Sequence, residues 1–439
     1  MKTLLLLAGR SKRFAPLEEK SLWPFLGKPL LAHQMERLKS GGLKDIIFVG
    51  GQHNLEEVDK LLPGVPSVEQ ENLNLGMRGA LLSALPQCKN EPVCIVSGND
   101  VVEPAAYAAL LEASTKPGVD GAILAQRVKR YFPGGYLMTS GTGKEQRVAG
   151  IVEKPGAGKE PSDLVNIVAH IHNHPEKLLD ALEDVSSDRD DAYEVALTKL
   201  CKSLNYVVVP YSGQWDAVKY PWHILSLTER FLSALQGEGK AVRAGKAEMA
   251  EKGIQVHPTA VIEGAVILEE GVKVLSHATI QGPCFIGKGT VIGTGALVRQ
   301  SIVGEGCVIG FGSEIARSNL HSHVWTHTTY LGDSVVGRNS AFGAGTVTAN
   351  FRLDEGEITS LIGEERIPTG RTKFGVTVGS DVRVGINASF APGVKVGKGV
   401  FINSGIFIDR DIPDGQYVKM KEGSLDMRAN TAKIPGVRP

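Results

Sequence analysis

The sequence predicts an α/β chain of two domains: a Rossmann-like α/β domain, followed by a left-handed parallel β-helix of hexapeptide repeats. Three observations support this fold class. The 439 residues are too many for one ordinary hydrophobic core. The first half alternates short apolar runs with amphipathic segments, and the second half places an apolar residue at every sixth position over long stretches.

The first half has the pattern of alternating strands and helices, which favours a mostly parallel sheet covered on both faces. Strands are expected at residues 4–8, 46–49, 93–96, 148–152, 165–171 and 206–210. Helices are expected at 30–40, around 81–85 and 175–182, at 192–204 and at 222–235.

From Val256 onward the hydrophobic period is six. Apolar residues recur at this spacing within 256–298, 303–315, 324–342 and 378–408, with Gly, Asn and Asp between them. This pattern indicates short strands that each point one side chain into a narrow core and are joined by tight corners. Each such coil buries its inner face only by stacking on its neighbours.

The repeat also defines the expected domain limits. We expect the first domain at residues 1–236, a linker rich in Gly, Lys and Ala at 237–253, the β-helix at 254–412 and a basic C-terminal tail at 413–439. Polar residues interrupt the repeat between Phe351 and Phe374, which indicates an insertion loop. Loops of this length on a rigid scaffold are usually functional.

The bulk composition limits the classes of function. The 48 basic and 48 acidic residues balance, so there is no general attraction to nucleic acid or to an anionic membrane. Five cysteines without CxxC spacing indicate reduced thiols. The apolar run at 4–8 is too short for a signal peptide, and no segment is long enough to span a membrane. We expect a cytoplasmic protein that binds neither nucleic acid nor a membrane.

A basic loop containing glycine follows the first predicted strand. Residues 7–17 read LAGRSKRFAPL and residues 20–30 read KSLWPFLGKPL. Such a turn lets backbone N–H groups approach a triphosphate, while Arg and Lys neutralise charge as pyrophosphate leaves. Both segments resemble the opening loop of sugar-nucleotide pyrophosphorylases. The resemblance implies nucleotide contacts at Ala8 and Gly9 and catalytic roles for Arg13 and Lys20. A solvated surface cation is the alternative for either.

Three further segments resemble parts of the same family. Residues 76–80 match a base-contacting segment, which implies nucleotide binding at Gly76. Asp100 follows a predicted strand where the family has a Mg²⁺ ligand, although an aspartate in a turn or helix cap is the alternative. Residues 214–222 resemble the segment with the second metal ligand. Asp216 would fill that role, but it stands one residue early, and Ala217 takes the expected position.

The segment Ile151–Pro155 is similar to the sugar-binding motif of these enzymes. The resemblance implies that Glu153 and Lys154 contact the sugar, together with Asn166 further along the chain. A purely structural ion pair between Glu153 and Lys154 is the alternative interpretation.

The β-helix carries a polar signature of its own. Residues 327–333 read HTTYLGD and residues 343–350 read GAGTVTAN. They resemble the acetyltransferase signature of bifunctional glucosamine-1-phosphate acetyltransferase/N-acetylglucosamine-1-phosphate uridylyltransferases, in their archaeal-type branch. The resemblance implies a nucleotidyltransferase domain before the β-helix. In the β-helix it implies an acyl-acceptor site that comprises Arg299, Arg317, Tyr330, Asn350 and Lys373.

His327 is the expected general base of this second site. An amine attacks a thioester only when it is unprotonated, and histidine can take up its proton near neutral pH. A capping role at a corner is one alternative for His327. A metal cluster with His321 and His323 is another, but it lacks a fourth ligand and the usual spacing. Tyr330 falls in the six-residue register, so it is alternatively a core aromatic.

The resemblance implies two reactions: acetyl transfer from acetyl-CoA to glucosamine-1-phosphate, and uridylyl transfer from an NTP, UTP, to the resulting N-acetylglucosamine-1-phosphate with Mg²⁺. We expect a homotrimer that packs through the flat faces of the β-helix, with acyl sites between subunits. One alternative is a single-function hexose-1-phosphate pyrophosphorylase with a structural β-helix. Another is an acyltransferase with an eroded nucleotidyl domain, which the departures at Ser11, Lys12 and Ala217 motivate. A non-catalytic scaffold is the least favoured.

Overall fold

The computed structural model describes residues 1–88, 91–141, 146–187, 189, 191–237, 246–431 and 436. It divides into two compact units. The first comprises Met1–Arg10 and Leu31–Ala217, and the second comprises Ser11–Leu30 and Val218–Pro439. The segment with Arg13 and Lys20 therefore clusters with the second unit. Part of the expected linker and the basic tail residues Lys433 and Arg438 lie outside the described residues.

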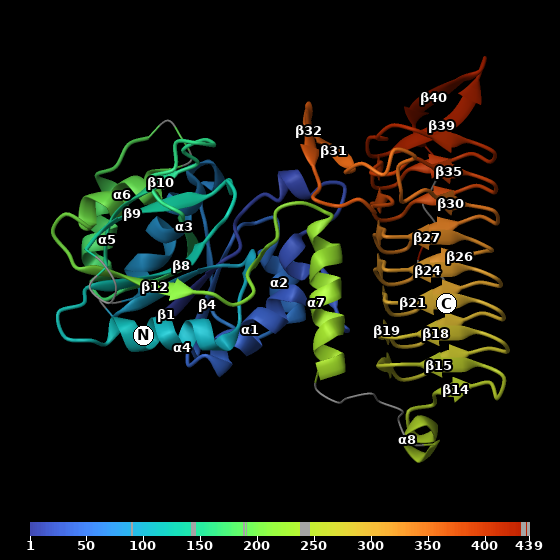
Figure 1. Cartoon of the computed structure of the whole chain (residues 1–439), viewed down its shortest axis with the longest axis horizontal. Helices are drawn as coiled ribbons and strands as arrows, with labels where there is room; N and C mark the ends of the chain where they lie inside the picture. Colours follow the sequence, from blue (N-terminus) through green and yellow to red (C-terminus); the bar gives the residue numbers. More distant parts are fainter. Residues whose placement is uncertain are drawn as a thin grey trace. The chain divides into compact units, whose positions relative to one another are not determined.

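A nine-stranded sheet forms the centre of the first unit, in the order β5-β4-β1-β6-β11-β8-β12-β10-β9 (Figure 1). The strands are β1 Lys2–Leu6, β4 Asp45–Gly50, β5 Ser67–Glu69, β6 Val93–Ser97, β8 Gly121–Arg127, β9 Gly135–Ser140, β10 Arg147–Glu153, β11 Leu164–His172 and β12 Tyr206–Tyr211. The prediction of a mostly parallel sheet is wrong for half of it. β11 runs antiparallel to β6 and β8, and β10 runs antiparallel to β9 and β12.

Helices pack against this sheet with apolar side chains. They are α1 Leu30–Ser40, α2 Leu55–Leu61, α3 Gly76–Ala84, α4 Pro104–Ser114, α5 Pro175–Glu183 and α6 Ala192–Leu200. α4 and α5 each begin with proline, which suits the first helical position because no N–H is needed there. Residues of α3, α5 and α6 share one buried apolar cluster with the sheet.

One edge of this sheet has the geometry of a ligand site. β1 lies between β4 and β6 and is parallel to both, so the carboxyl ends of these three strands lie at one edge of the sheet, where open α/β sheets bind their ligands. Because β11 is antiparallel to β6, its amino end lies at the same edge. Two short strands, β7 Asp100–Val101 and β13 Asp216–Ala217, form a separate antiparallel ribbon.

The second unit contains the predicted left-handed β-helix, whose coils stack in Figure 1 from β14 to the C-terminal hairpin. The first face consists of β14 Gln255–Val256, β17 Lys273–Val274, β20 Val291–Ile292, β23 Val308–Ile309, β26 Trp325–Thr326, β29 Ala341–Phe342, β34 Arg383–Val384, β37 Phe401–Ile402, β39 Gln416–Lys421 and β40 Ser424–Ala429. The second face consists of β15 Val261–Glu263, β18 Thr279–Gln281, β21 Leu297–Arg299, β24 Glu314–Ala316, β27 Tyr330–Gly332, β30 Val347–Thr348, β35 Ser389–Phe390 and β38 Phe407–Ile408. The third face consists of β16 Val266–Leu268, β19 Cys284–Ile286, β22 Ile302–Val303, β25 Asn319–Leu320, β28 Val335–Val336, β33 Thr377–Val378 and β36 Lys395–Val396.

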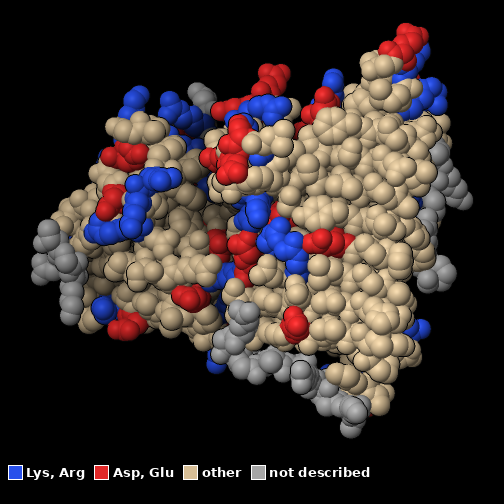
Figure 2. All heavy atoms as spheres, turned by 45° about the vertical axis from the view of Figure 1, so that its right-hand side comes forward, with Lys and Arg blue, Asp and Glu red and all other residues tan. Residues whose placement is uncertain are grey.

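The inward positions of the coils form one continuous apolar core of Val, Ile, Leu and Phe side chains. Much of the outer surface of these coils that Figure 2 shows carries few charged side chains. The six-residue register assigns Tyr330 to the core, and this assignment is wrong. At this corner the inward positions Thr326 and Leu331 are five positions apart instead of six. Leu331 therefore takes the inward position, where it pairs with Ile315 and is fully buried. Tyr330 therefore faces outward.

The predicted insertion forms a hairpin of β31 Thr359–Ile362 and β32 Glu365–Pro368. The second unit also contains α7 His223–Gly237, α8 Lys246–Glu251 and the small pair β2 Pro24–Phe25 and β3 Lys28–Pro29. Among the described residues, none of the helices combines the length and the apolar character that crossing a bilayer requires.

The basic loop is attached to the coils inside the second unit. The indole N–H of Trp23 donates to Oδ1 of Asn319 at 3.0 Å, and the amide of Asn319 donates to Thr228 of α7 at 2.8 Å. Both bonds are buried, so they fix the loop, α7 and one coil as a single packed assembly.

Candidate active sites

The loop after β1 is held by backbone contacts that leave Gly9 open. The buried side chain of Asn54 donates to the carbonyl of Leu7 at 2.9 Å and accepts from the N–H of Gly51 at 3.0 Å. A Cβ added at Gly9 would meet no atom within 4 Å. The backbone at Gly9 therefore has open space beside it, which the predicted contact of Ala8 and Gly9 with a phosphate requires.

The predicted base-contacting segment lies next to this loop. Arg10 donates to Oδ1 of Asn74 at 2.9 Å, and Gln70 donates to the carbonyl of Gly76 at 2.9 Å. Gly76 has φ 53° and ψ −139°, a combination open essentially to glycine alone. The structure thus brings Gly9 and Gly76 to one side of the sheet. Sequence reasoning missed Arg10 and Asn74, since a lone Arg–Asn pair 64 residues apart carries no local signal.

Asp100 lies on the β7–β13 ribbon and accepts a hydrogen bond from the indole of Trp215 at 2.8 Å. The register pairs Asp100 with Ala217 and pairs Asp216 with Val101. Because facing residues share one side of an antiparallel ribbon, Trp215 and Ala217 lie on the side of Asp100, and Asp216 lies on the other. The structure therefore does not bring the two predicted metal ligands to the same side.

The predicted sugar-binding residues converge at the amino end of β11. Glu153 on β10 pairs with Gly135 on β9. A Cβ placed on Gly135 would stand 2.6 Å from Nδ2 of Asn166 and 3.2 Å from Oε2 of Glu153. Lys154 forms an ion pair with Glu153 at 2.7 Å and has the left-handed φ of 44°. A glycine is thus required here, because the amide of Asn166 and the carboxylate of Glu153 occupy the space that a Cβ would take.

The loop with Arg13 and Lys20 makes side-chain contacts within the second unit. Ser11 has a left-handed φ of 48°, and its hydroxyl lies 3.1 Å from both carboxylate oxygens of Glu19. Arg13 is exposed, with its guanidinium 5.9 Å from the ring centroid of Tyr220. Because these residues belong to the second unit and Asp100 to the first, their predicted convergence on one phosphate site stays a prediction.

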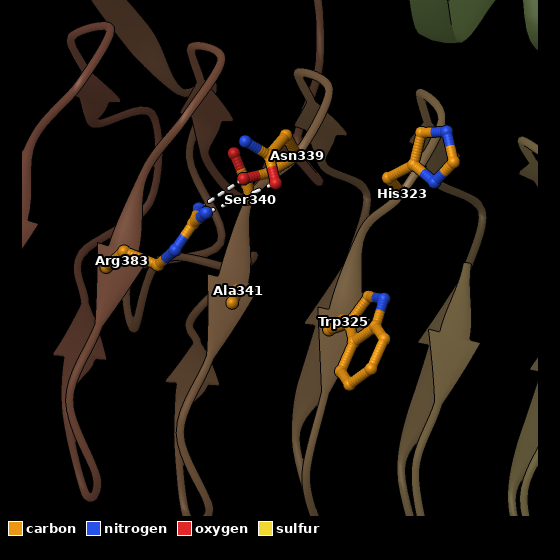
Figure 3. A pocket seen from close by; sticks show the side chains of 6 residues that line it. All are labelled: His323, Trp325, Asn339, Ser340, Ala341 and Arg383. Carbon is orange, nitrogen blue, oxygen red and sulfur yellow. Dashed lines mark hydrogen bonds between the residues drawn. The ribbon is translucent and has the colours of Figure 1, made fainter. Parts of the chain in front are cut away.

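A shallow hollow opens on the β-helix where the third face turns into the first (Figure 3). Its empty space of about 180 Å³ includes open solvent, so the enclosed volume is smaller still, and it is lined by His323, Trp325, Asn339, Ser340, Ala341 and Arg383. Ligand sites usually exceed about 300 Å³. Arg383 is already bonded across the hollow to Asn339, at 3.1 Å between Nη2 and Oδ1. The hollow is therefore too small to be the acyl-acceptor site, and Arg383 is already engaged in it.

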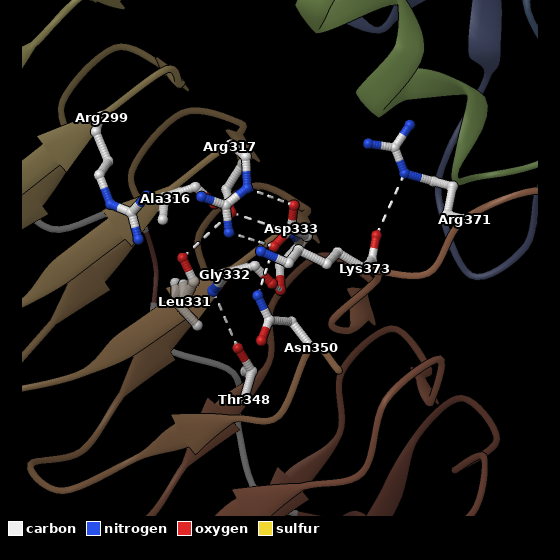
Figure 4. A network of polar contacts seen from close by, with 12 residues as sticks. Arg299, Ala316, Arg317, Leu331, Gly332, Asp333, Thr348, Asn350, Arg371 and Lys373 are labelled. Atoms are coloured by element: carbon white, nitrogen blue, oxygen red, sulfur yellow. Dashed lines mark hydrogen bonds and ion pairs between the residues drawn. The ribbon is translucent and has the colours of Figure 1, made fainter. Parts of the chain in front are cut away.

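The predicted acyl-acceptor residues gather where the second face turns into the third (Figure 4). Arg317 donates from Nε and Nη2 to the two oxygens of Asp333, at 2.8 and 2.7 Å. The amide of Asn350 donates to the same carboxylate and to the hydroxyl of Tyr330 at 3.2 Å. Gly332 makes this possible, because a Cβ there would stand 2.4 Å from the Tyr330 oxygen.

Two acidic residues that sequence reasoning did not select hold this corner together. Asp333 is 1% exposed and adopts a left-handed φ of 48°, which Asp tolerates better than most residues. Glu314 accepts from Nε and Nη2 of Arg299, one coil before Arg317. Asp333 stands in the matched signature itself, so the Gly-Asp pair at 332–333 was a usable signal. Each guanidinium keeps its Nη1 edge out of these bonds.

Lys373 reaches this corner from the end of the insertion hairpin, and Figure 4 shows its side chain extending toward Asp333. The neighbouring Arg371 donates to Ser226 and Glu229 of α7, which anchors the base of the hairpin. The structure thus brings Arg317, Asn350 and Lys373 together with Tyr330, as the sequence predicts.

His327 lies just before β27, at the corner where the first face turns into the second. Asp333 and Arg317 lie at the corner beyond the other end of this strand. The register pairs Thr326 with Ile309 and Phe342, so Gly310 and Gly343 are the neighbours of His327 in the adjacent coils. With no side chain on either neighbour, the imidazole is exposed. Within one chain, therefore, β27 separates the expected base from Arg317 and Asp333.

No group of three or more His, Cys, Asp or Glu side chains in the described part of the chain has an arrangement suited to a metal ion. This argues against the metal-cluster interpretation of His321, His323 and His327. The cysteines are unpaired, and burial raises the pKa of the Cys201 and Cys307 thiols to about 12. Thiolate chemistry is therefore disfavoured at both.

Comparison with known proteins covers both units. Residues 3–247 match the model of the MobA-like NTP transferase domain. A bifunctional sugar-1-phosphate nucleotidylyltransferase/acetyltransferase of Sulfurisphaera tokodaii is 30% identical over 96% of this chain and 100% of its own length. The bifunctional protein GlmU of Methanocaldococcus jannaschii is 30% identical over 96% of this chain and 98% of its own. Apo UDP-glucose pyrophosphorylase aligns at 18% identity with a TM-score of 0.46, over 53% of this chain and 99% of that one.

Proposed function

Because the chain belongs to the family of bifunctional sugar-1-phosphate nucleotidylyltransferases/acetyltransferases, we propose that it catalyses both reactions on consecutive substrates. The β-helix transfers an acetyl group from acetyl-CoA to glucosamine-1-phosphate. The α/β domain transfers a uridylyl group from UTP to N-acetylglucosamine-1-phosphate and releases pyrophosphate. The observation that carries this proposal is the presence of a separate polar cluster in each unit, each built from the residues that match its own signature.

In the nucleotidyl reaction, the backbone at Ala8 and Gly9 would hold the triphosphate, and Gly76 would contact the base. Arg13 and Lys20 would neutralise the charge that develops on the leaving pyrophosphate. Glu153, Lys154 and Asn166 would orient the sugar so that its phosphate oxygen attacks in line. These roles follow the family resemblance and agree with the open space at Gly9 and with the close approach of Asn166 and Glu153 to Gly135.

Mg²⁺ fits this site with Asp100 as its carboxylate ligand. Mg²⁺ in nucleotide sites commonly takes one or two carboxylates and completes its shell with phosphate oxygens and water. Asp100 uses Oδ1 to accept from Trp215. Asp216 lies on the other side of the ribbon, so we do not assign it as the partner ligand. When bound, the ion neutralises the phosphates against which the sugar phosphate reacts.

In the acetyl reaction, Arg299, Arg317 and Lys373 would bind the phosphate of the amino sugar, while Tyr330 and Asn350 hold its hydroxyl groups. His327 would take the proton from the amine as it attacks the thioester. Since His327 lies across β27 from Arg317, the substrate would lie along the outer side of the second face. The exposed position of His327 between Gly310 and Gly343 leaves room for the acyl donor.

We further propose that three chains assemble around this face. Large apolar side chains are exposed on the second face and on the corner that carries His327. They include Val347 at 45%, Ile386 at 53%, Phe407 at 58% and Phe311 at 68% exposure. Monomeric proteins rarely expose such an apolar series along one side, and cyclic symmetry would bury it in a homotrimer with acyl sites between subunits. Cytoplasmic localisation is part of the same proposal, since both substrates and the reduced thiols belong there.

One pair of assays tests the two activities on the same purified protein. Pyrophosphate release is measured with UTP, N-acetylglucosamine-1-phosphate and Mg²⁺, and free thiol release is measured with acetyl-CoA and glucosamine-1-phosphate. We expect His327→Ala to abolish thiol release only and Asp100→Ala to abolish pyrophosphate release only. A panel of other NTPs, hexose phosphates and acyl-CoA donors, run in the same way, defines the substrate range.

Each rival makes a different prediction in these assays. A single-function pyrophosphorylase releases pyrophosphate, but His327→Ala changes nothing and acetyl-CoA is not consumed. An acyltransferase with an eroded nucleotidyl domain releases thiol but no pyrophosphate. The position of Ala217 opposite Asp100 favours this second rival. Rapid pyrophosphate release that Asp100→Ala abolishes would exclude it.

A further inference from the structure

Five polar side chains of the first unit form one continuous buried hydrogen-bonded chain. Oδ1 of Asn166 lies 3.1 Å from Nε2 of His170, and Nδ1 of His170 lies 2.7 Å from the hydroxyl of Tyr193. That hydroxyl lies 3.0 Å from Nε2 of His172, and Nδ1 of His172 lies 2.8 Å from the hydroxyl of Tyr206. None of the five residues is more than 6% exposed. Only Asn166 has a role in the proposed reaction.

An irregularity in β11 creates this chain. The register pairs Asn166 with Ala125 and His170 with Ile123, so four steps along β11 oppose two steps along β8. A bulge of this kind shortens the strand and turns Asn166 and His170 into neighbours on one face. In a regular strand these residues would stand about 13 Å apart. The bulge therefore carries the chain to the sugar-binding edge of the sheet.

A missing side chain makes room at the far end. Gly121 pairs with both His172 and Tyr206, and a Cβ on it would stand 2.2 Å from the Tyr206 ring. The bare glycine lets the Tyr206 ring lie against the strand and direct its hydroxyl to His172. Tyr193 comes from α6 and inserts its hydroxyl between the two histidines.

Both histidines are neutral. Burial lowers the pKa of His170 to about 3, only partly offset by a backbone hydrogen bond to Ile167, and it lowers the pKa of His172 well below its usual value. A neutral imidazole has one nitrogen that donates and one that accepts. Because the chain uses both nitrogens of both rings, one proton position determines all the others. The hydrogen bonds are therefore all donated in one direction, either from Tyr206 towards Asn166 or from Asn166 towards Tyr206.

The surroundings at both ends favour the first direction. Nδ2 of Asn166 and Oε2 of Glu153 both lie beside the Cα of Gly135. A donating amide group is stable next to a carboxylate, whereas the reverse direction would place the amide oxygen there. At the other end, the Tyr206 hydroxyl donates to His172 in this forward direction. In the reverse direction it would accept from His172, and the described residues provide no other acceptor for its proton. The forward direction thus leaves no buried proton without a partner.

We propose that Tyr193, held by both histidines, is a positioning residue that fixes Asn166 with its amide nitrogen towards the bound sugar phosphate. In this arrangement Asn166 only donates a hydrogen bond at the sugar subsite. The subsite therefore selects a sugar phosphate that offers an acceptor oxygen at this point, such as a hydroxyl or an amide carbonyl. A group that only donates, such as an ammonium group, is rejected because its hydrogen-bonding requirement is unmet. The proposal rests on the proposed nucleotidyl function.

The first experiment compares Tyr193→Phe with Tyr107→Phe, which removes a hydroxyl from another buried tyrosine of the same unit that lies outside the chain. We expect Tyr193→Phe to raise the KM for the sugar phosphate about tenfold, as the loss of one well-placed hydrogen bond does. The KM for UTP stays unchanged, and so does acetyl transfer by the β-helix. Tyr107→Phe changes neither KM.

A double variant separates positioning from a merely structural role. In the Asn166→Ala background the amide is absent, so adding Tyr193→Phe should change the sugar KM no further. Additive losses, or an equal rise in the KM for UTP, overturn the positioning role. In a series of monodeoxy sugar phosphates, one analogue should abolish the difference between wild type and Tyr193→Phe, because it lacks the accepting oxygen. If every analogue preserves the difference, the selection is refuted.

The second experiment needs no activity. Long-range ¹H–¹⁵N spectra of full-length protein labelled with ¹⁵N-histidine distinguish the two neutral tautomers directly. We expect His170 and His172, assigned through His→Gln variants, to carry the proton on Nε2 at pH 7. A proton on Nδ1 of either ring reverses the chain and overturns the proposal. Wild-type protein that releases no pyrophosphate from any sugar phosphate refutes the proposed function and the selection with it, while these spectra still decide the direction of the chain.

Discussion

The stability of the first unit should fall in mild acid because of His170. This histidine is fully buried and neutral, and burial lowers its pKa from 6.5 to about 3. In the unfolded chain the same imidazole is exposed and takes up a proton with its ordinary pKa near 6.5. Between these two values the unfolded state binds more protons than the folded state. The contribution of His170 to the free energy of unfolding is therefore constant above about pH 7.5 and decreases as the pH falls through 6.5 towards 3.

The two pKa values set the size of this effect. At pH 5 the unfolded state gains about 2 kcal/mol from protonation of this single histidine, and the slope approaches about 1.4 kcal/mol per pH unit. His172 adds a loss in the same direction, since burial lowers its pKa as well. His170→Gln isolates the first contribution. Glutamine still donates to Asn166 and accepts from Tyr193, but it takes up no proton.

Hydrogen exchange in β11 peptides, measured by mass spectrometry at pH 8 and pH 5, reports the free energy of opening of the first unit alone. After correction for intrinsic exchange rates, wild type should lose about 2 kcal/mol more than His170→Gln between these pH values. His257→Gln, at a surface position, serves as the control and should follow wild type. If wild type and His170→Gln lose the same amount to within about 0.5 kcal/mol, the buried neutral histidine is refuted.

Three substitutions probe the other constraints. Asp333→Asn removes the charge that binds the partly buried Arg317 and should lower the free energy of unfolding, measured in urea, by about 2 kcal/mol. Asp354→Asn, in an exposed ion pair with Arg352, should change nothing measurable, and equal effects of the two variants would contradict this prediction. Ser11→Ala loses the hydrogen bond to Glu19 and should lower the free energy of thermal unfolding by about 1 kcal/mol. Ser11→Gly should be neutral, because glycine relieves the left-handed backbone and this offsets the lost hydrogen bond; an equal loss of stability in both variants would refute the backbone strain. Gly121→Ala should lower the free energy of unfolding by about 3 kcal/mol, because the added methyl group displaces the Tyr206 ring. Unchanged hydrogen exchange in β11 would refute this clash.

The β-helix shows how far a sequence repeat can be followed. The spacing of six predicts the coils, their apolar core and the insertion between Phe351 and Phe374, because every coil has to supply the same inward side chain. It fails at Tyr330. A corner shortened by one residue moves Leu331 inward and turns the tyrosine to the surface. Periodicity alone does not show which of two adjacent apolar residues faces the core at such a corner.

The two aspartates of the predicted metal site show a similar limit. The sequence places Asp216 one position before the expected slot, and the structure shows the consequence of that shift. Along a strand, a displacement of one residue moves a side chain to the opposite side. Ala217 thus faces Asp100, and Asp216 faces away from it.

What the sequence determines by itself are the features encoded by local pattern. These are the alternation of strands and helices, the hexapeptide coils, and the motifs that contain Arg317, Tyr330, Asn350 and the predicted sugar-binding residues. Only the tertiary structure decides the features that depend on residues far apart in the chain. The mixed direction of the central sheet, the Arg317–Asp333 pair and the chain of histidines and tyrosines behind Asn166 are of this kind. The physical reason is that a buried polar group selects its partner by position in space, and a bulge or a bare glycine that brings the partner into hydrogen-bonding distance leaves no periodic trace in the sequence.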